Sequence, residues 1–280
     1  MAFVAVAAAL AAPSSLAQGV LVRSVFHSAS LPANAITSFR VSCPPGFAAT
    51  SAGISRPAPG VTTLSIRPVG GRAYTFRFGN PVTNSDEQVT VVVACRKFPL
   101  KPGTKLTVVP LRVKVTVPPR KLRAADFLCP PGTAPSGGAA DIAPVRSQRY
   151  VPGAPDLLSV RRLSMHLNGF GFTIRNDGKV PRRVVVYGMC LTAPRPAGSS
   201  PERLQVRITT FRTPITPGTH QVIHRCPRAW VALGAGYSLR SPRTHVPGAA
   251  ALGASGRWTV SSDLGGTTTA DLQLVCARLI

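Results

Sequence analysis

The sequence predicts an all-β protein made of three tandem antiparallel β repeats, each closed by one disulfide within the repeat. The 280-residue chain holds 28 Pro and 25 Gly, and proline breaks helix interiors but is tolerated at turns and sheet edges. Abundant Val, Thr and aromatic residues favour strands instead. A set of landmarks around the six cysteines recurs three times in the same order, which is typical of repeat proteins.

Each set of landmarks begins with a cysteine in a turn motif and ends with a cysteine after an apolar run. The motif is Cys43-Pro44-Pro45-Gly46 in the first copy, Cys129-Pro130-Pro131-Gly132 in the second and Cys226-Pro227-Arg228 in the third. Proline pre-sets the backbone angle of a turn and glycine tolerates positive φ, so a turn is expected at each motif. The closing cysteines, which are Cys95, Cys190 and Cys276, follow 50 to 61 residues later.

The first repeat spans residues 18–99 and contains six apolar or alternating stretches that we expect to be strands. These stretches are 20–28, 36–43, 47–55, 62–67, 73–78 and 88–96. The second repeat, residues 100–195, opens with the alternating segment 111–117, in which aliphatic residues alternate with polar or basic ones. Its other expected strands are 124–129, 157–168, 170–175 and 183–190.

The third repeat spans residues 196–280 and begins in a Pro- and Ser-rich linker, residues 194–201. Its expected strands are 204–211, 220–226, 230–239, 257–261 and 269–279. Residues 1–17 precede the first repeat and are expected to be a secretory signal, because an apolar run ends in the small-x-small sequence Ser15-Leu16-Ala17. No later stretch reaches the roughly 20 apolar residues of a transmembrane helix.

Six cysteines divided evenly over three repeats favour an exported protein with three disulfides. Fifteen pairings are possible, and the repeat selects Cys43–Cys95, Cys129–Cys190 and Cys226–Cys276. Closing such loops stabilises each copy by roughly 4 kcal/mol in the chain-entropy model. The competing zinc-site interpretation requires close cysteine pairs, which the chain lacks.

The order of these landmarks resembles a cysteine-pair β module of secreted bacterial proteins whose role is unknown. It is also similar, more weakly, to the three-fold β-prism of vitelline membrane outer layer proteins, which likewise use C-P-x-G and closing cysteines. The first resemblance implies a small disulfide-closed β unit, and the second implies a prism of three such units. An immunoglobulin-like sandwich remains a third possibility, because the cysteine spacing suits it.

Charge is the second outstanding property of the sequence. The chain carries 33 Lys and Arg against 9 Asp and Glu, a formal net charge of +24, which bears on partners rather than on fold. Residues 101–195 alone hold 16 basic and 4 acidic residues, so they contribute 16 − 4 = +12. Few aromatic residues lie near the basic ones, which argues against base stacking and sequence-specific nucleic-acid recognition.

The candidate anion-binding residues all lie in the second repeat. They are Arg112, Lys114, Arg161, Arg162, Arg182 and Arg183. Arginine forks match the oxygens of phosphate and carboxylate groups, and strand alternation puts Arg112 and Lys114 on one side about 7 Å apart. The two arginine doublets are expected at neighbouring strand ends. A smaller contribution is expected from the basic residues of the first repeat, which include Arg56, Arg67, Arg72 and Arg77.

Catalytic and metal-binding motifs are not apparent in the sequence. The chain has no G-x-S-x-G elbow and no phosphate loop, and its carboxylates are few for a glycoside hydrolase. His220 and His224 would lie about 13 Å apart on a strand, too far to share a metal. We therefore expect no catalytic residue, no metal site and no cofactor.

Together these observations predict a non-enzymatic protein, secreted or at the cell surface, that associates with anionic extracellular material. Envelope polymer, acidic glycan and the DNA backbone are the candidate partners. The alternative is a structural surface or coat protein without a specific ligand, and a hydrolase acting on envelope polymer comes third.

Overall fold

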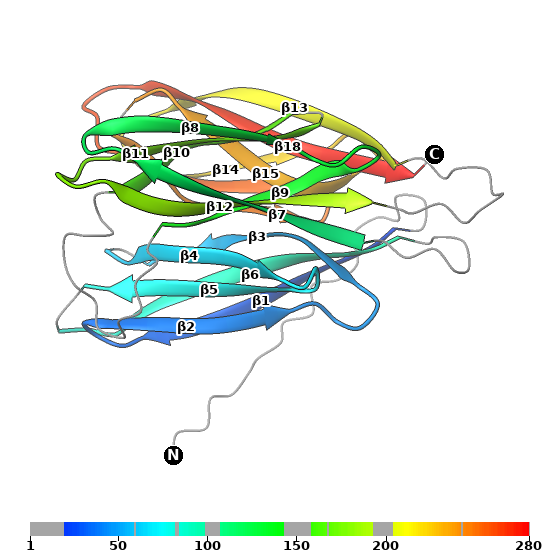
Figure 1. The fold of residues 1–280 in the computed structure, drawn as a ribbon, viewed down its shortest axis with the longest axis horizontal. Helices are drawn as coiled ribbons and strands as arrows, with labels where there is room; N and C mark the ends of the chain where they lie inside the picture. Colours follow the sequence, from blue (N-terminus) through cyan, green and yellow to red (C-terminus); the bar gives the residue numbers. More distant parts are fainter. Residues whose placement is uncertain are drawn as a thin grey trace, which may run out of the picture.

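The computed structural model shows a molecule built from β strands (Figure 1). The structure describes residues 20–58, 60–81, 84–98, 107–142, 158–166, 168–192, 204–241 and 243–279. Every element of regular structure in these ranges is a strand, which confirms the all-β prediction. The expected signal, residues 1–17, and the expected linker, residues 194–201, lie outside the described residues.

The first six strands form two small antiparallel groups. They are β1 (Leu21–Leu31), β2 (Ala35–Ser42), β3 (Ala48–Arg56), β4 (Thr62–Val69), β5 (Ala73–Asn80) and β6 (Glu87–Lys97). One group has the order β1-β6-β3 and the other has the order β2-β5-β4. Along β5, Tyr74, Phe76 and Phe78 are buried, whereas Thr75 and Arg77 between them are partly exposed. Because successive strand residues point to opposite faces, the aromatic side chains pack into the core.

The next six strands pair in the same two orders. They are β7 (Thr107–Val117), β8 (Lys121–Leu128), β9 (Ala134–Asp141), β10 (Leu158–His166), β11 (Gly169–Asn176) and β12 (Arg182–Thr192). β7, β12 and β9 are neighbours in that order, as are β8, β11 and β10. The alternation expected in β7 is present, since Val115 and Val117 are buried while Arg112 and Lys114 are exposed.

The last six strands repeat these orders once more. They are β13 (Leu204–Ile215), β14 (Gly218–Arg225), β15 (Val231–Leu239), β16 (Thr244–Leu252), β17 (Ser255–Ser262) and β18 (Thr268–Leu279). β13 pairs with β18, which pairs with β15, and β14 pairs with β17, which pairs with β16. Trp258 on β17 is fully buried, and its indole N–H donates to the carbonyl of Gly236 at 2.9 Å.

Two of these strands, β9 and β16, were missing from the sequence-based expectation. Both are rich in Gly, Ala and Pro, which are poor strand formers. Their extended backbone is stabilised by neighbouring strands, because β9 pairs with β12 and β16 pairs with β17. Small side chains also permit close approach, since a Cβ on Gly137 of β9 would lie 2.8 Å from the carbonyl oxygen of Thr50 on β3.

The sheets cross the boundaries that the sequence predicted between repeats. The eighteen strands form four sheets, with the orders β1-β6-β3, β2-β5-β4-β9-β12-β7, β13-β18-β15-β10-β11-β8 and β14-β17-β16. Ser65 of β4 pairs with Asp141 of β9, and the N–H of Ile142 donates to the carbonyl of Leu64 at 3.0 Å. β10 joins β15 in the same way. The three stretches of chain therefore share sheets (Figure 1).

β3 and β16, from the two three-stranded sheets, also lie close together. A Cβ on Gly53 of β3 would overlap the carbonyl oxygen of Ala249, and a Cβ on Gly248 of β16 would lie 2.5 Å from the carbonyl oxygen of Ile54. Glycine at both positions lets the two backbones approach. This contact brings the beginning of the fold against its end.

The predicted disulfides are all present, joining Cys43–Cys95, Cys129–Cys190 and Cys226–Cys276. Each opening cysteine is followed by a turn closed by a 3.1 Å backbone hydrogen bond. These bonds run from Phe47 to Pro44, from Thr133 to Pro130 and from Trp230 to Pro227. The third turn residue has φ of 80° at Gly46, 76° at Gly132 and 66° at Ala229. The turn inferred from C-P-x-G is therefore also present in the third motif, where alanine occupies the position of glycine.

Candidate functional site

Basic side chains gather on the outward side of the six-stranded sheet β2-β5-β4-β9-β12-β7. We call this surface the basic face and define it by Arg40 on β2, Arg77 on β5, Arg67 on β4, Arg183 on β12, and Arg112 and Lys114 on β7. All of them are exposed except Arg77, which is partly exposed. The inward side of the same sheet holds apolar residues such as Phe76 and Val186, which are fully buried.

Strand register shows that these residues share one side, because directly opposed residues of an antiparallel pair point the same way. In one row of opposed residues, Thr75 of β5 lies between Arg40 of β2 and Arg67 of β4. Further along the same row, Tyr187 of β12 lies opposite Arg112 of β7. The adjacent row crosses all six strands as Ser38, Arg77, Ser65, Asp141, Val185 and Lys114. With strands about 4.8 Å apart and same-side residues about 7 Å apart, the face is about 24 Å wide.

Tyr187 lies within the basic face and is 6% exposed. Burial raises the pKa of its phenol, and the nearby Asp141 carboxylate raises it further, whereas the charges of Arg112 and Arg67 lower the pKa and Arg112 also hydrogen-bonds the phenol. Arg67 belongs to β4 and Arg112 to β7. Both therefore act on one phenol although 45 residues separate them in the sequence.

Three of the six predicted anion-binding residues, Arg112, Lys114 and Arg183, lie on this face. Arg182 does not, because it alternates with Arg183 and pairs with Val117, which is fully buried. The doublet is therefore divided between the two sides of the sheet. Arg161 and Arg162 belong to β10, which is part of the other six-stranded sheet, so the doublets do not occupy neighbouring strand ends as expected.

Arg161 requires a correction, because it is only 7% exposed. Its guanidinium donates to the carbonyl oxygen of Thr244 at 2.9 Å and to that of Ser241, and burial lowers its pKa. The cause is a β-bulge between Val160 and Arg162, which interrupts the alternation and turns the side chain inward. Arg162 is on the outer side but forms a 3.2 Å ion pair with Asp126.

The sequence interpretation missed Arg40, Arg67 and Arg77 as partners of the second-repeat residues. The sequence predicts a smaller contribution from Arg67 and Arg77, because they lie in residues 18–99, the first of the three expected repeats. Their place beside Arg112 and Lys114 follows from the β4–β9 pairing, which joins the two stretches. No local pattern signals that pairing, because it depends on long-range packing.

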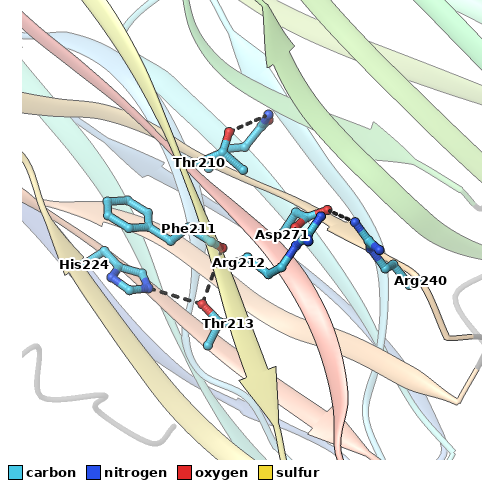
Figure 2. Close-up of polar contacts among 8 residues, drawn as sticks. Thr210, Phe211, Arg212, Thr213, His224, Arg240 and Asp271 are labelled. Atoms are coloured by element: carbon cyan, nitrogen blue, oxygen red, sulfur yellow. Dashed lines mark hydrogen bonds and ion pairs between the residues drawn. The ribbon is translucent and has the colours of Figure 1, made fainter.

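The other six-stranded sheet differs because its outward acids are paired with arginines. Asp271 lies 3.5 Å from Arg212 and 3.5 Å from Arg240, and Figure 2 shows it between the two arginines. Asp126 pairs with Arg162, and Arg175 is bonded to Asp177 at 2.5 Å. Ion pairs of this kind neutralise much of the local charge, whereas the basic face carries six basic residues, defined above, and a single acid, Asp141. The excess positive charge is therefore uneven over the molecule.

Among the described residues the histidines gather no cluster of acids, although His245 lies 3.8 Å from Asp263. His224 stacks on Phe211 with ring centroids 3.9 Å apart and lies 3.4 Å from the Thr213 hydroxyl (Figure 2), and burial lowers its pKa. His220 instead contacts Thr216 and Pro217. No group of three or more His, Cys, Asp or Glu that could hold a metal occurs among the described residues.

Comparison with known proteins adds no family to this description. No protein-family model matches the chain, and no curated protein is significantly similar to it. Within the described part of the chain, no helix is long and apolar enough to cross a membrane.

Proposed function

We propose that the chain consists of three homologous repeats, residues 18–99, 100–195 and 196–280, arranged as a three-fold prism. Three features support this proposal. Each stretch contains six strands paired in the same two orders. In each stretch the disulfide joins the residue directly after the second strand to the sixth strand, and a β-bulge follows the start of the third strand by three residues or fewer. The fourth strand of each stretch also contacts the third strand of another stretch. These contacts are between β4 and β9, between β10 and β15, and between β16 and β3.

We further propose that the protein is a non-enzymatic, exported protein that binds anionic polymer through the basic face. The observation that carries this proposal is the concentration of Arg40, Arg67, Arg77, Arg112, Lys114 and Arg183 on one side of one sheet, while acids on the other large sheet are paired. Three disulfides agree with an oxidising, extracellular location. Envelope polymer, acidic glycan and the DNA backbone share the chemistry that this face recognises.

The geometry of the face suits an extended polyanion better than a single small anion. Its basic groups are spread over about 24 Å, so no single anion of phosphate size reaches them all. The spacing of about 7 Å between Arg112 and Lys114 along β7 is close to that of successive phosphates on an extended nucleic-acid strand. Exposed charges gain little from single pairs, so affinity arises from many weak contacts and depends on salt.

The test compares two variants that lose the same charge. In the first, Arg40, Arg67, Arg112 and Lys114 of the basic face are all changed to Ser. In the control, four exposed basic residues outside the face, Lys121, Arg123, Arg207 and Arg225, are changed to Ser. Binding to long-chain polyphosphate is measured by fluorescence anisotropy over a range of NaCl concentrations, with thermal unfolding as a check of folding.

We expect the basic-face variant to bind much more weakly than the wild-type protein. The slope of log Kd plotted against log salt concentration should fall by about three units, because each lost contact contributes about 0.7. The control variant should lose less than one unit. Equal losses in the two variants would show that the charge acts diffusely, and no binding by the wild-type protein would reject polyanion association altogether. Cleavage of the polymer would indicate a hydrolase instead.

A further inference from the structure

A second candidate site lies away from the basic face. A cavity of about 330 Å3 is lined by residues of β3, β9 and β15 and of the strands beside them, β4, β10 and β16. All three stretches of the chain therefore contribute to its wall. Among the described lining residues none is Lys, Arg, Asp or Glu, although the chain is strongly basic.

The wall contains three side chains from corresponding points on β3, β9 and β15, namely Ile54, Ala140 and Tyr237. They pair with Val91, Val186 and Leu272 respectively, and these partners are fully buried. Directly opposed residues share a side of the sheet, so all three face the interior. Phe78 and Phe172, both buried, also line the cavity.

Ala140 keeps part of this space open. The corresponding residues, Ile54 and Tyr237, are much larger, so a branched side chain is compatible with the backbone at this point of the strand. Protein interiors are normally filled to the density of organic crystals, and an unfilled apolar cavity forfeits dispersion contacts. Alanine at this position leaves space that a larger side chain would occupy.

Polar side chains are few among the lining residues. The Tyr237 hydroxyl donates to the carbonyl of Val160 at 3.4 Å, and His245, whose side chain is 51% exposed, lies 3.8 Å from Asp263. Thr63 and Ser159 supply further hydroxyls. A wall of this composition disfavours ions, because transferring a charge from water to unpaired apolar surroundings is costly.

We propose that this cavity is a binding site for one uncharged, largely apolar small molecule. Ligand pockets of this kind are mostly apolar with a few polar groups that fix orientation. An engineered cavity of about 150 Å3 accommodates benzene, so the larger cavity here holds roughly a dozen non-hydrogen atoms. The site is independent of polyanion binding and does not use any residue of the basic face.

The test uses 2-naphthol, which has a size matching the cavity and is uncharged at pH 7. Its binding to the full-length protein is measured by equilibrium dialysis and by its fluorescence, at low and at high NaCl. Ala140→Leu fills the cavity, and Ala124→Leu is the matched control because Ala124 is exposed on β8. Naphthalene-2-sulfonate has the same rings with a negative charge and reports binding to the basic surface.

We expect one 2-naphthol per chain, no dependence on salt, at least tenfold weaker binding to Ala140→Leu and unchanged binding to Ala124→Leu. The four-residue Ser variant of the basic face should retain this binding, which separates the two proposals. If thermal unfolding shows that Ala140→Leu does not fold, Ala140→Val replaces it, with a severalfold loss expected. The proposal is overturned if the wild-type protein shows no saturable binding, if both alanine variants bind equally, or if the sulfonate competes for the same site.

Discussion

The guanidinium of Arg96 donates two hydrogen bonds to the carbonyl oxygen of Ala232, which follows it by 136 residues, from Nε at 3.1 Å and from Nη2 at 2.6 Å. Further bonds reach the carbonyls of Arg23, Cys95 and Gly253. Arg96 is completely buried, and burial lowers its pKa to about 9, so it is charged at neutral pH. The acceptors of its hydrogen bonds are backbone carbonyls of β1, of its own strand β6, of β15 and of the turn between β16 and β17.

Removing the Arg96 side chain should therefore destabilise the junction between the first and last strands. Arg96→Ala leaves buried carbonyls without donors and opens a cavity, so we expect a loss of about 3–5 kcal/mol. Arg96→Lys should recover only part of it, because one ammonium cannot reproduce the planar donor pattern of a guanidinium. Urea unfolding of both variants, with exposed Arg225→Ala as the control, measures the difference. Equal stability of Arg96→Ala and Arg225→Ala would contradict this role.

The turn at Ala229 should be improved by glycine. Ala229 has φ of 66°, in the left-handed region that costs a non-glycine residue roughly 1–2 kcal/mol, whereas glycine adopts it freely but loses more entropy on folding. We expect Ala229→Gly to raise the free energy of unfolding by about 0.5–1 kcal/mol. The reciprocal change Gly46→Ala should lower it by a similar amount. Thermal melts of the two variants check the signs, and a loss of stability in Ala229→Gly would refute the strain argument.

Gly256 and Trp258 on β17 are expected to be energetically coupled. A Cβ on Gly256 would approach within 2.8 Å of Leu274 and would overlap the Trp258 indole, so Gly256→Ala should cost about 1–3 kcal/mol by overpacking. In a Trp258→Phe background the smaller ring vacates this space, and the same change should cost less than half as much. A double-mutant cycle by chemical denaturation measures the coupling. If the destabilisation by Gly256→Ala and that by Trp258→Phe simply add, the Trp258 indole does not occupy the space of the methyl group introduced by Gly256→Ala.

Alkaline titration should reveal two protected tyrosines. Burial raises the pKa of Tyr74 and of Tyr237, the latter partly offset by the charge of Arg161. Because the folded-state pKa exceeds the unfolded value of about 10, the stability from each neutral phenol is complete below pH 10 and is lost as the pH rises above it. Arg96 has the opposite effect on stability. Because burial lowers its folded-state pKa to about 9, the folded protein loses this proton before the unfolded chain does, and the contribution of Arg96 to the free energy of unfolding rises with pH above 9.

The readout is tyrosinate absorbance at pH 11, before and after adding denaturant. The chain has four tyrosines, and we expect at most two of them to ionise while the protein remains folded. Denaturant should then release the signal of the others, with one tyrosinate fewer in Tyr74→Phe. Ionisation of all four in a protein with intact circular dichroism would disprove the protection.

Some elements of this fold are encoded by local sequence patterns, and others depend on long-range strand pairing. β5 and β7 were expected because their apolar residues alternate with polar ones, and the turns after Cys43 and Cys129 because proline and glycine set the backbone there. β9 and β16 were missed because small residues carry no periodic signal. Arg161 was misplaced because a bulge is a property of strand pairing, and its neighbours in the sequence do not encode it.

The sequence by itself determined the all-β class, the described strands other than β9 and β16, and the three disulfide pairs, because alternation, turn residues and cysteine order are local or periodic properties. Only the tertiary structure decided that Arg40, Arg67 and Arg77 share a surface with Arg112 and Lys114, and that Arg96 and Arg161 are buried donors to carbonyls. The physical reason is that charge is encoded residue by residue, whereas its exposure depends on which strands pair. Here the pairing of Ser65 with Asp141 joins two half-sheets into one face.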